Sequence, residues 1–178
     1  MTSDPKAAAP KAAAPKAAGQ KAAAGQAALE DGGLVIEGPS YSAGFWLWHA
    51  TLRWQREIAA VLAPLGLTHV QFVLLSCAWW LNDHGILPNQ LELARQAGTD
   101  VKMTSQVVRK LEAKGLLERR TDPDDTRARR LRITSEGTDL ALRAIEHVEQ
   151  ADAAFFGPAA RAGTSMETIA ALLRLLTQ

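Results

Sequence analysis

The sequence predicts a mainly α-helical domain that carries a small β-hairpin wing, which is the arrangement of a winged helix-turn-helix. Helical spacing of apolar residues, capping signals and one hairpin pattern predict this fold. The hairpin pattern lies within residues 99–134, where a helix ends at Lys114-Gly115 and two short segments, 116–120 and 129–133, flank the turn-forming residues 122–125. The expected order is four helices, the hairpin and two more helices.

The first two predicted helices are apolar. A wide apolar stripe runs along residues 44–63 and stops at Pro64 and Gly66. Thr68 and Gln71 have the spacing of a capping box, in which each side chain accepts a hydrogen bond from the other residue's backbone amide. They open a second helix, VQFVLLSCAWWLND, which is apolar on nearly all sides and is expected to be buried.

Each later helix begins at a polar residue whose side chain can cap the first turn. These cap residues are Asn89 (with Glu92), Asp100, Thr134 and Thr164 (with Glu167). The expected helices are a short one that ends at Ala97-Gly98, a fourth over about 101–114, a fifth over 134–157 that Gly157-Pro158 stops, and a terminal helix over 164–177.

Composition bounds the domain organisation. Residues 1–41 include the tract PKAAAPKAAAPKAAGQKAAAGQ, which is expected to be a disordered, weakly cationic arm and linker because proline breaks helices and alanine alone offers no core. Residues 42–178 are expected to form one domain, with the winged helix-turn-helix over about 67–133. The single cysteine excludes an internal disulfide, and no apolar run approaches the ~20 residues that span a bilayer. A cytoplasmic location on the nucleoid, without membrane contact, is expected.

Charge is segregated along the chain, although the net charge is only +1. Residues 102–132 hold ten Lys and Arg against five Asp and Glu, and residues 1–28 hold four Lys against one Asp. A basic patch on an acidic body can bind phosphates while the rest of the surface repels DNA. A solvated charged face would show the same run, but the helix and hairpin around it favour duplex DNA binding.

The fourth predicted helix supplies the candidate base-contacting residues. Its apolar positions follow helical spacing and are expected to face the core: Val101, Thr104, Val107, Val108 and Leu111. Of the outward positions, Lys102, Ser105 and Gln106 are expected at base edges, since Gln can bond adenine bidentately and Lys can reach guanine. Met103 is expected against a thymine methyl group, and phosphates are expected at Arg109 and Lys110.

The hairpin supplies arginines. Arg127 lies at the expected tip, where it suits a narrow minor groove, and Asp125 can hold its guanidinium by charge-assisted hydrogen bonds. Further arginines on the two strands are candidates for phosphate contacts: Arg119, Arg120, Arg129, Arg130 and Arg132.

The stretch ELARQAGTDVKMTSQVVRKLEAKGLLERRTDPDDTRARRLRITSEG resembles the core of the MarR family (multiple antibiotic resistance regulators). The matching phrases are Lys110-Leu111-Glu112, Gly115-Leu116, Asp122-Pro123, Asp125, Arg127, and Ile133-Thr134 through Gly137. Lys110 and Ile133 depart mildly from the Arg and Leu that the family shows. The resemblance covers about 42–178 and omits the arm.

This resemblance implies a transcriptional regulator, expected to be a repressor, that binds an inverted repeat as a homodimer. The helices expected to pair between subunits are the first and the last two. It also implies a small, often aromatic or phenolic, ligand between the dimer helices and the winged domain. Candidate ligand residues are Trp46, His49, Arg53, Trp79 and Trp80, which could stack on a ring or neutralise a carboxylate. Packing in the core and the dimer interface would explain the same aromatic residues.

Other functions stay open. The arm suggests a nucleoid-associated architectural DNA binder, and Cys77 suggests a redox sensor, although its apolar neighbours offer no cation to activate the thiol. A protein-interaction module is a further alternative, against which Asp125 and Arg127 argue. The histidines lack a metal-ligand spacing and no nucleophile–base grouping stands out, so neither a metal, a cofactor nor an enzymatic activity is expected.

Overall fold

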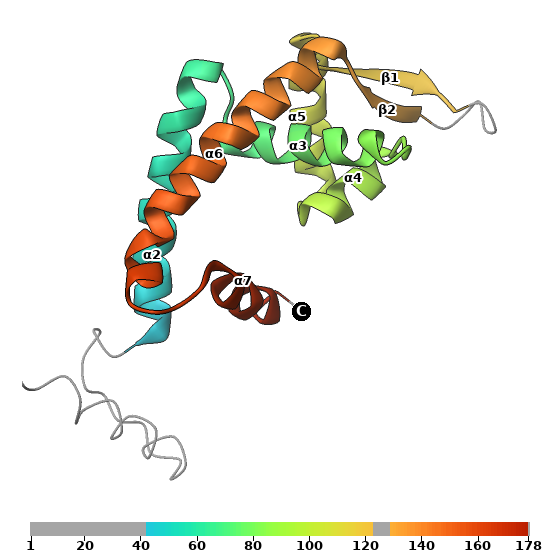
Figure 1. Ribbon diagram of the computed structural model, residues 1–178. Coiled ribbons are helices and arrows are strands. Elements are labelled where there is room, and N and C mark those ends of the chain that lie inside the picture. The colour runs from blue at the N-terminus through green and yellow to red at the C-terminus, as the bar shows by residue number, and fades with distance from the viewer. Residues whose placement is uncertain (1–41, 123–128, 178) are drawn as a thin grey trace, which may run out of the picture. The chain divides into compact units, whose positions relative to one another are not determined.

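The structure is a computed structural model that describes residues 42–122 and 129–177. The described elements are α2 (Ala43–Leu62), a 3-10 turn (Ala63–Leu65), α3 (His69–Asp83), α4 (Gln90–Ala97), α5 (Val101–Ala113), β1 (Leu117–Thr121), β2 (Arg129–Ile133), α6 (Ser135–Arg161) and α7 (Met166–Leu175). This order confirms the predicted fold of helices with one hairpin (Figure 1).

Helix α3 forms the centre of the core. It contacts α4, α5, α6 and β2, and Figure 1 shows it passing behind α6. Leu74, Leu75 and Ala78 of α3 are fully buried, as is Leu111 of α5. Each fully buried leucine contributes about 1.5–3 kcal/mol relative to an exposed one. The apolar character of this segment in the sequence is therefore explained by burial between helices.

Helices α2 and α6 are joined by apolar packing and by a side-chain hydrogen bond. Ile58 of α2 and Val148 of α6 belong to the same buried cluster. Farther from the hairpin, the indole Nε1 of Trp54 donates a 2.6 Å hydrogen bond to Oδ1 of Asp152. Among the described helices none is by itself long and apolar enough to cross a membrane; only the bent pair Ala43–Leu65 and His69–Asp83, with an angle of 73° between its members, reaches that length and composition.

Capping fixes most of the helix starts where the sequence predicts them. The predicted capping box of Thr68 and Gln71 is present, with hydrogen bonds of 3.1 and 3.3 Å, and the same arrangement opens α4. Thr134 caps α6 through the amide of Gly137 at 2.9 Å. Gly98, in the left-handed region with φ of 63°, ends α4 as expected.

Two helix boundaries in the C-terminal segment differ from the prediction. Helix α6 does not stop at Gly157-Pro158 but continues to Arg161, because Pro158 lies in the last turns and Gly163, with φ of 94°, supplies the left-handed residue that reverses the chain. Helix α7 begins after Ser165, whose hydroxyl accepts from the Thr168 amide at 3.2 Å, so Ser165 is the cap and not Thr164.

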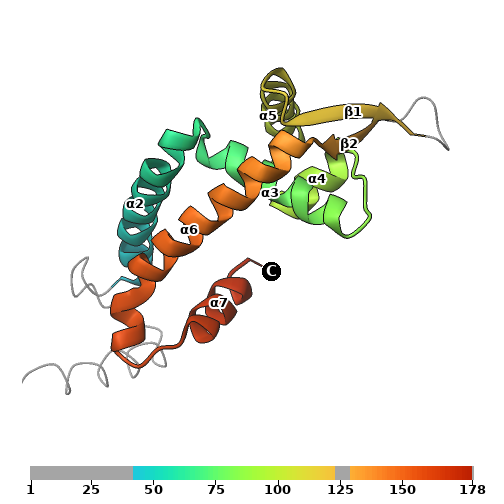
Figure 2. The same cartoon turned by 45° about the horizontal axis from the view of Figure 1, so that its top comes forward.

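The hairpin pairs β1 and β2 in antiparallel register, with Leu117 opposite Ile133 and Thr121 opposite Arg129. It extends away from the helices beside α5 (Figure 2). The outer edge of β2 is also bonded, since the Leu131 amide donates to the Pro88 carbonyl at 2.8 Å. The wing strand is therefore held on both edges: by β1 and by the segment that precedes α4.

Candidate nucleic-acid interface

The N-terminal end of α5 is tightly fixed. The Asp100 side chain accepts hydrogen bonds from the amides of Lys102 and Met103 at 2.8 and 3.0 Å. The buried Thr104 hydroxyl bonds the Asp100 carbonyl and the Thr99 hydroxyl, both at 2.8 Å. A carboxylate at this position also complements the positive end of the helix dipole. The turn that carries the candidate base-contacting residues is therefore held by hydrogen bonds within the protein.

The polar face predicted for α5 is presented to solvent. Thr104, Val108 and Leu111 are buried, as expected from their spacing, and Val107 is half-buried. The exposed residues are Lys102, Met103, Gln106, Arg109 and Lys110, with Ser105 half-buried. The prediction that Val101 faces the core is wrong, because Val101 is 45% exposed. It lies in the first turn of α5, where it lines an open hollow with the start of α4.

The C-terminal end of α5 is held by Lys114. Its Nζ donates to the Gly66 carbonyl at 2.6 Å and to Oε1 of Gln71 at 3.1 Å. The Gly66 carbonyl lies at the turn that follows α2, and Gln71 belongs to the capping box of α3. Lys114 thus joins the end of α5 to the junction between α2 and α3, and it is not directed to the surface that the other basic residues of α5 form.

The strand arginines differ in their partners. Arg119 forms an ion pair with Glu112 at 3.3 Å, and Arg120 forms one with Glu118 at 2.7 Å. Arg129 is exposed and donates to the Thr121 hydroxyl. Asp125 and Arg127, the predicted tip residues, lie outside the described residues.

Arg130 is held by the protein itself. Its guanidinium bonds the buried carboxylate of Asp122, Oε2 of Glu92 at 3.0 Å and the Leu87 carbonyl at 3.3 Å. The hydrogen bond with Asp122 is the main cause that raises the pKa of Arg130 above its ordinary value. Glu92 Oε2 also accepts from the Asn89 amide at 2.8 Å, so one carboxylate oxygen connects the cap of α4 with the wing.

A shallow hollow of about 340 Å³ lies beside this network. Its lining comes from the first turns of α4 and α5 and from both strands: Asn89, Gln90, Leu91, Val101, Arg119, Arg129 and Leu131. Gln90 Nε2 is buried and has no hydrogen-bond partner among the described residues. The guanidinium of Arg129, the buried amide of Gln90 and the Arg119 guanidinium, which also pairs with Glu112, give this hollow hydrogen-bond donors for an oxygen anion.

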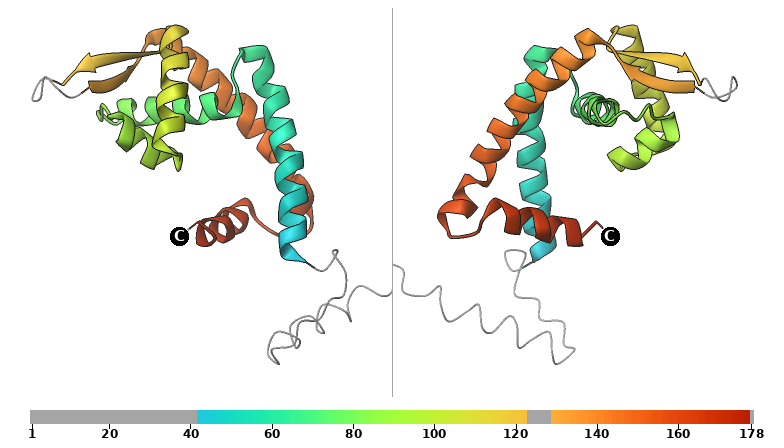
Figure 3. Two further views of the ribbon diagram at one scale, coloured as in Figure 1. Left: turned by 180° about the vertical axis from the view of Figure 1, so that it is seen from behind. Right: turned by 45° about the vertical axis from the view of Figure 1, so that its right-hand side comes forward.

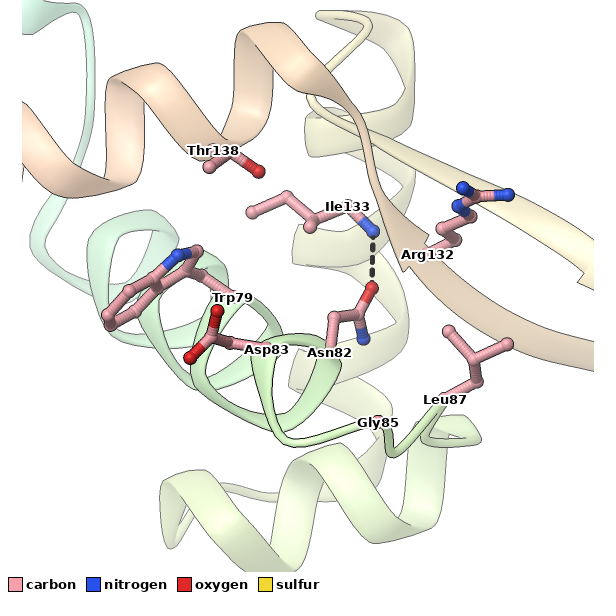
Figure 4. Close-up of a pocket in the computed structure, with 8 residues that line it drawn as sticks. All are labelled: Trp79, Asn82, Asp83, Gly85, Leu87, Arg132, Ile133 and Thr138. Atoms are coloured by element: carbon pink, nitrogen blue, oxygen red, sulfur yellow. Dashed lines mark hydrogen bonds between the residues drawn. The ribbon is translucent and has the colours of Figure 1, made fainter.

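A larger cavity of about 460 Å³ lies where α3, β2 and α6 meet (Figure 4). Its lining residues are Trp79, Asn82, Asp83, Gly85, Leu87, Arg132, Ile133 and Thr138. The sequence indicates Trp79 as a ligand residue and Arg132 as a phosphate contact. It gives no signal for the cavity itself, because its walls come from segments about 50 residues apart, as the hydrogen bond between Asn82 and Ile133 illustrates.

The other predicted ligand residues do not line this cavity. Trp80 is 43% exposed and stacks on His84, and Arg53 pairs with Glu57 at 2.8 Å and lies over the Phe155 ring. Trp46 makes an edge contact with Phe45, and His49 is exposed. No group of three metal-ligating side chains occurs in the parts of the chain that the structure describes.

The capped helix with its polar face and the adjoining hairpin define a winged helix-turn-helix. A sequence model of the MarR family matches residues 67–128. The chain is 41% identical over 137 residues to the uncharacterized HTH-type transcriptional regulator YdcH of Bacillus subtilis (strain 168), which covers 77% of this chain and 93% of that protein. It is 34% identical over 121 residues to the HTH-type transcriptional repressor Rv2887 of Mycobacterium tuberculosis (strain ATCC 25618 / H37Rv), with coverages of 68% and 82%.

Solved structures with the same fold carry ligands or DNA. CouR from Rhodococcus jostii RHA1 bound to p-coumaroyl-CoA matches with a TM-score of 0.66 and 25% identity, over 80% of this chain and 93% of that one. CouR on a 23-mer DNA duplex matches with a TM-score of 0.66 and 26% identity, over 82% and 99%. BpsR of Bordetella bronchiseptica, whose DNA binding is regulated by 6-hydroxynicotinic acid, matches with a TM-score of 0.64 and 27% identity, over 78% and 92%. The chain belongs to the MarR family of transcriptional regulators.

Proposed function

We propose that this regulator is a homodimeric repressor that binds an inverted repeat and leaves it when a small molecule binds. The observation that carries the proposal is the exposed polar face of α5, which Asp100 and Lys114 fix at its two ends. Lys102, Ser105 and Gln106 contact base edges, with Met103 against a thymine methyl group, because they lie in the N-terminal half that enters the major groove. Repression is supported by the 34% identity with a repressor.

Phosphate contacts come from the basic residues around this face. Arg109 and Lys110 extend from α5, and Arg119 and Arg129 line the oxygen-anion hollow between α4 and the strands. Arg127, with Asp125 as its partner in sequence, is the proposed minor-groove contact. Each such cation releases counterions from DNA, so binding will weaken as salt concentration rises.

Exposed apolar surface on the helices supports the proposed dimer. Helix α7 has no buried residue, although Leu172, Leu173 and Leu175 lie on it and Leu176 follows directly. Pairing of α2, α6 and α7 with a second copy would cover this surface. A two-fold dimer presents two α5 helices about one DNA turn apart, and this requires an inverted repeat.

The effector site is proposed in the cavity between α3, β2 and α6. The Trp79 indole offers a stacking face, Arg132 a cation and Asp83 an anion, so a small aromatic acid that also carries a hydrogen-bond donor is the expected class. The ligands of CouR and BpsR, p-coumaroyl-CoA and 6-hydroxynicotinic acid, support an aromatic effector. Trp79 thus remains in the proposed set, and Asp83 and Arg132 replace Trp46, His49, Arg53 and Trp80.

A gel shift on the DNA upstream of the protein's own gene tests the proposal. Gln106→Ala is expected to lower affinity for that DNA by about 10- to 100-fold, the cost of one bidentate base contact, and to leave binding to unrelated DNA unchanged. Gln96→Ala, an exposed glutamine of α4, is the matched control. Absence of a specific shift with the wild-type protein would overturn the proposal.

The same assay, together with a footprint, distinguishes a sequence-specific repressor from the architectural DNA binder that the cationic arm suggests. Deletion of residues 1–28 is expected to weaken binding to all DNA modestly and to leave the footprint on the inverted repeat intact. An architectural binder would instead coat unrelated sequences and lose most of its affinity with the arm.

The redox alternative rests on Cys77, which is half-buried. Burial raises the pKa of its thiol, so the reactive thiolate is scarce near neutral pH. Addition of peroxide is therefore expected to leave the gel shift unchanged, and Cys77→Ala is expected to bind as the wild-type protein does. Release by peroxide that the Cys77→Ala variant does not show would establish the redox mechanism instead.

A further inference from the structure

Asn82, in the last turn of α3, bonds three backbone groups that belong to two other segments. Its Nδ2 donates to the Ile86 carbonyl at 3.1 Å and to the Leu131 carbonyl at 3.3 Å. Its Oδ1 accepts from the Ile133 amide at 2.8 Å, the bond that Figure 4 draws. An amide side chain carries both a donor group and an acceptor, so it can bond a strand edge as a neighbouring strand would.

The bonded groups belong to the outer edge of the wing. In the antiparallel register with β1, successive residues of β2 direct their backbone groups alternately to β1 and away from it. Leu131 and Ile133 are directed away, as the bonds to Pro88 and Asn82 show. Without Asn82, the Leu131 carbonyl and the Ile133 amide would lose these partners at a half-buried position, which is costly for backbone groups.

The contact also determines where the wing lies. Two strands alone form a marginally stable hairpin that can change its angle to the domain. The Arg130 network joins the hairpin to α4, whereas Asn82 joins the base of β2 to α3, the helix that forms the centre of the core. Two attachments on different helices fix both the position of the hairpin and its direction relative to α5.

We propose that Asn82 is a positioning residue for DNA binding, which holds β2 against α3 so that the wing and α5 can contact the duplex together. The proposal rests on the proposed function. Asn82 itself lies at the wall of the α3–β2–α6 cavity, and its amide is engaged by backbone groups of the protein. Its effect on affinity arises because a wing that is already in place does not have to be ordered on binding.

Hydrogen exchange on the full-length protein, measured without DNA, tests whether Asn82 holds β2. In Asn82→Ala, the Ile133 amide is expected to exchange at least about tenfold faster, since it loses its acceptor, while amides in α5 and α6 keep their wild-type rates. Asn82→Asp retains the acceptor but loses the donors, so it is expected to keep Ile133 protected. Gln96→Ala, which removes an exposed side-chain amide from α4, is the matched control. Unchanged exchange at Ile133, or a uniform rise through all helices, would overturn the proposal.

A footprint on the specific DNA tests the consequence. Asn82→Ala is expected to lose protection where the wing contacts the duplex and to retain protection in the major groove, with about tenfold weaker binding. Arg129→Ala should add little to this variant, whereas Gln106→Ala should add its full effect. A wild-type footprint with Asn82→Ala would overturn the positioning role. If the wild-type protein binds no specific DNA, the proposed function fails, and the exchange measurement still decides whether Asn82 holds the wing.

Discussion

At the scale of single residues, neighbouring arginines of one strand have different roles. Arg129 and Arg130 are equivalent in the sequence, and both match the pattern of a phosphate contact. In the structure Arg130 bonds Asp122 and Glu92, whereas Arg129 is exposed on the hairpin edge. Because side chains alternate along a strand, the two arginines point to opposite faces of the hairpin. The carboxylates that hold Arg130 come from Asp122 and from Glu92 of α4, so the sequence alone could not show which arginine is paired.

Salt dependence distinguishes the two arginines. Arg129→Gln is expected to lower the slope of the logarithm of the DNA-binding constant against the logarithm of salt concentration by about 1, because one phosphate contact is lost. Arg130→Gln is expected to weaken binding without changing that slope, since its charge is already paired within the protein. Binding titrations at several salt concentrations measure both slopes. Equal slope changes would mean that Arg130 leaves its carboxylates to contact DNA.

His69 gives a pH-dependent stability. Burial lowers the pKa of His69 below its ordinary value of 6.5, and the nearby Asp152 opposes this in part. The Trp54 ring, which bonds Asp152, lies edge-on to the imidazole at 5.0 Å. Because the unfolded chain takes up this proton more readily than the folded protein, stability is lost as pH falls below about 6.5.

The thermal midpoint should therefore decline less with acidification in His69→Gln than in the wild-type protein. Calorimetry at about pH 7.5 and about pH 5.5 measures the two declines, and their difference isolates His69 from the other titrating groups. Gln96→Ala, at an exposed position of α4 that carries no titratable group, is the control and should decline as the wild-type protein does. An identical decline in all three proteins would show that His69 titrates alike in the folded and unfolded states.

At the scale of elements, most helix starts are predictable from the sequence because they depend on local capping residues. Features that depend on how the elements pack together are not. Thr68, Asn89 and Asp100 cap helices where the sequence predicts, because a cap depends on residues within one turn. The end of α6 was misplaced because proline in a last turn is tolerated when the chain reverses later at a glycine. The cavity and the Asn82 contacts were not predictable, since they depend on how α3 packs against β2.

In the first turn of α6, the glycine of the motif Ile133-Thr134 through Gly137 is required for steric reasons. A Cβ at this residue would lie 2.1 Å from the Leu116 carbonyl oxygen and 2.8 Å from Cγ1 of Ile133. That carbonyl cannot easily move, because it accepts from the Thr134 amide at 3.2 Å. Gly137→Ala is therefore expected to destabilise the protein by about 1–3 kcal/mol, as overpacking does.

Chemical denaturation measures this change against a control on the same helix. Gly157→Ala would place its Cβ 3.3 Å from the flexible end of Arg161, so alanine's higher helix propensity should leave stability unchanged or raise it by about 0.5–1 kcal/mol. Similar effects of the two substitutions would contradict the steric argument.

At the scale of the whole molecule, the described residues bury a core around α3 and leave apolar side chains of α7 exposed. The core around α3 is closed, and α5 and the hairpin are fixed by capping, by Lys114 and by the wing contacts. Figure 3 shows α7 beyond the C-terminal end of α6, away from the hairpin. A short helix whose leucines stay largely exposed in its own protomer is expected to be stabilised when another surface covers it.

Leu175, the last residue of α7, and Leu176, which follows it, are 66% and 73% exposed and provide the test of dimerisation. The double substitution of Leu175→Glu and Leu176→Glu should weaken the dimer by at least about 100-fold, because each leucine contributes roughly 1.5–3 kcal/mol and an unpaired buried carboxylate costs more. Light scattering should show twice the chain mass for the wild-type protein and for the control Gln96→Glu, and the chain mass for the double variant. Circular dichroism should show the helices outside α7 intact, since α7 has no buried residue.

A monomer contacts one half of an inverted repeat, so specific DNA binding should be lost together with the dimer. A double variant that remains dimeric would place the subunit contact elsewhere and leave the exposed leucines of α7 without a partner.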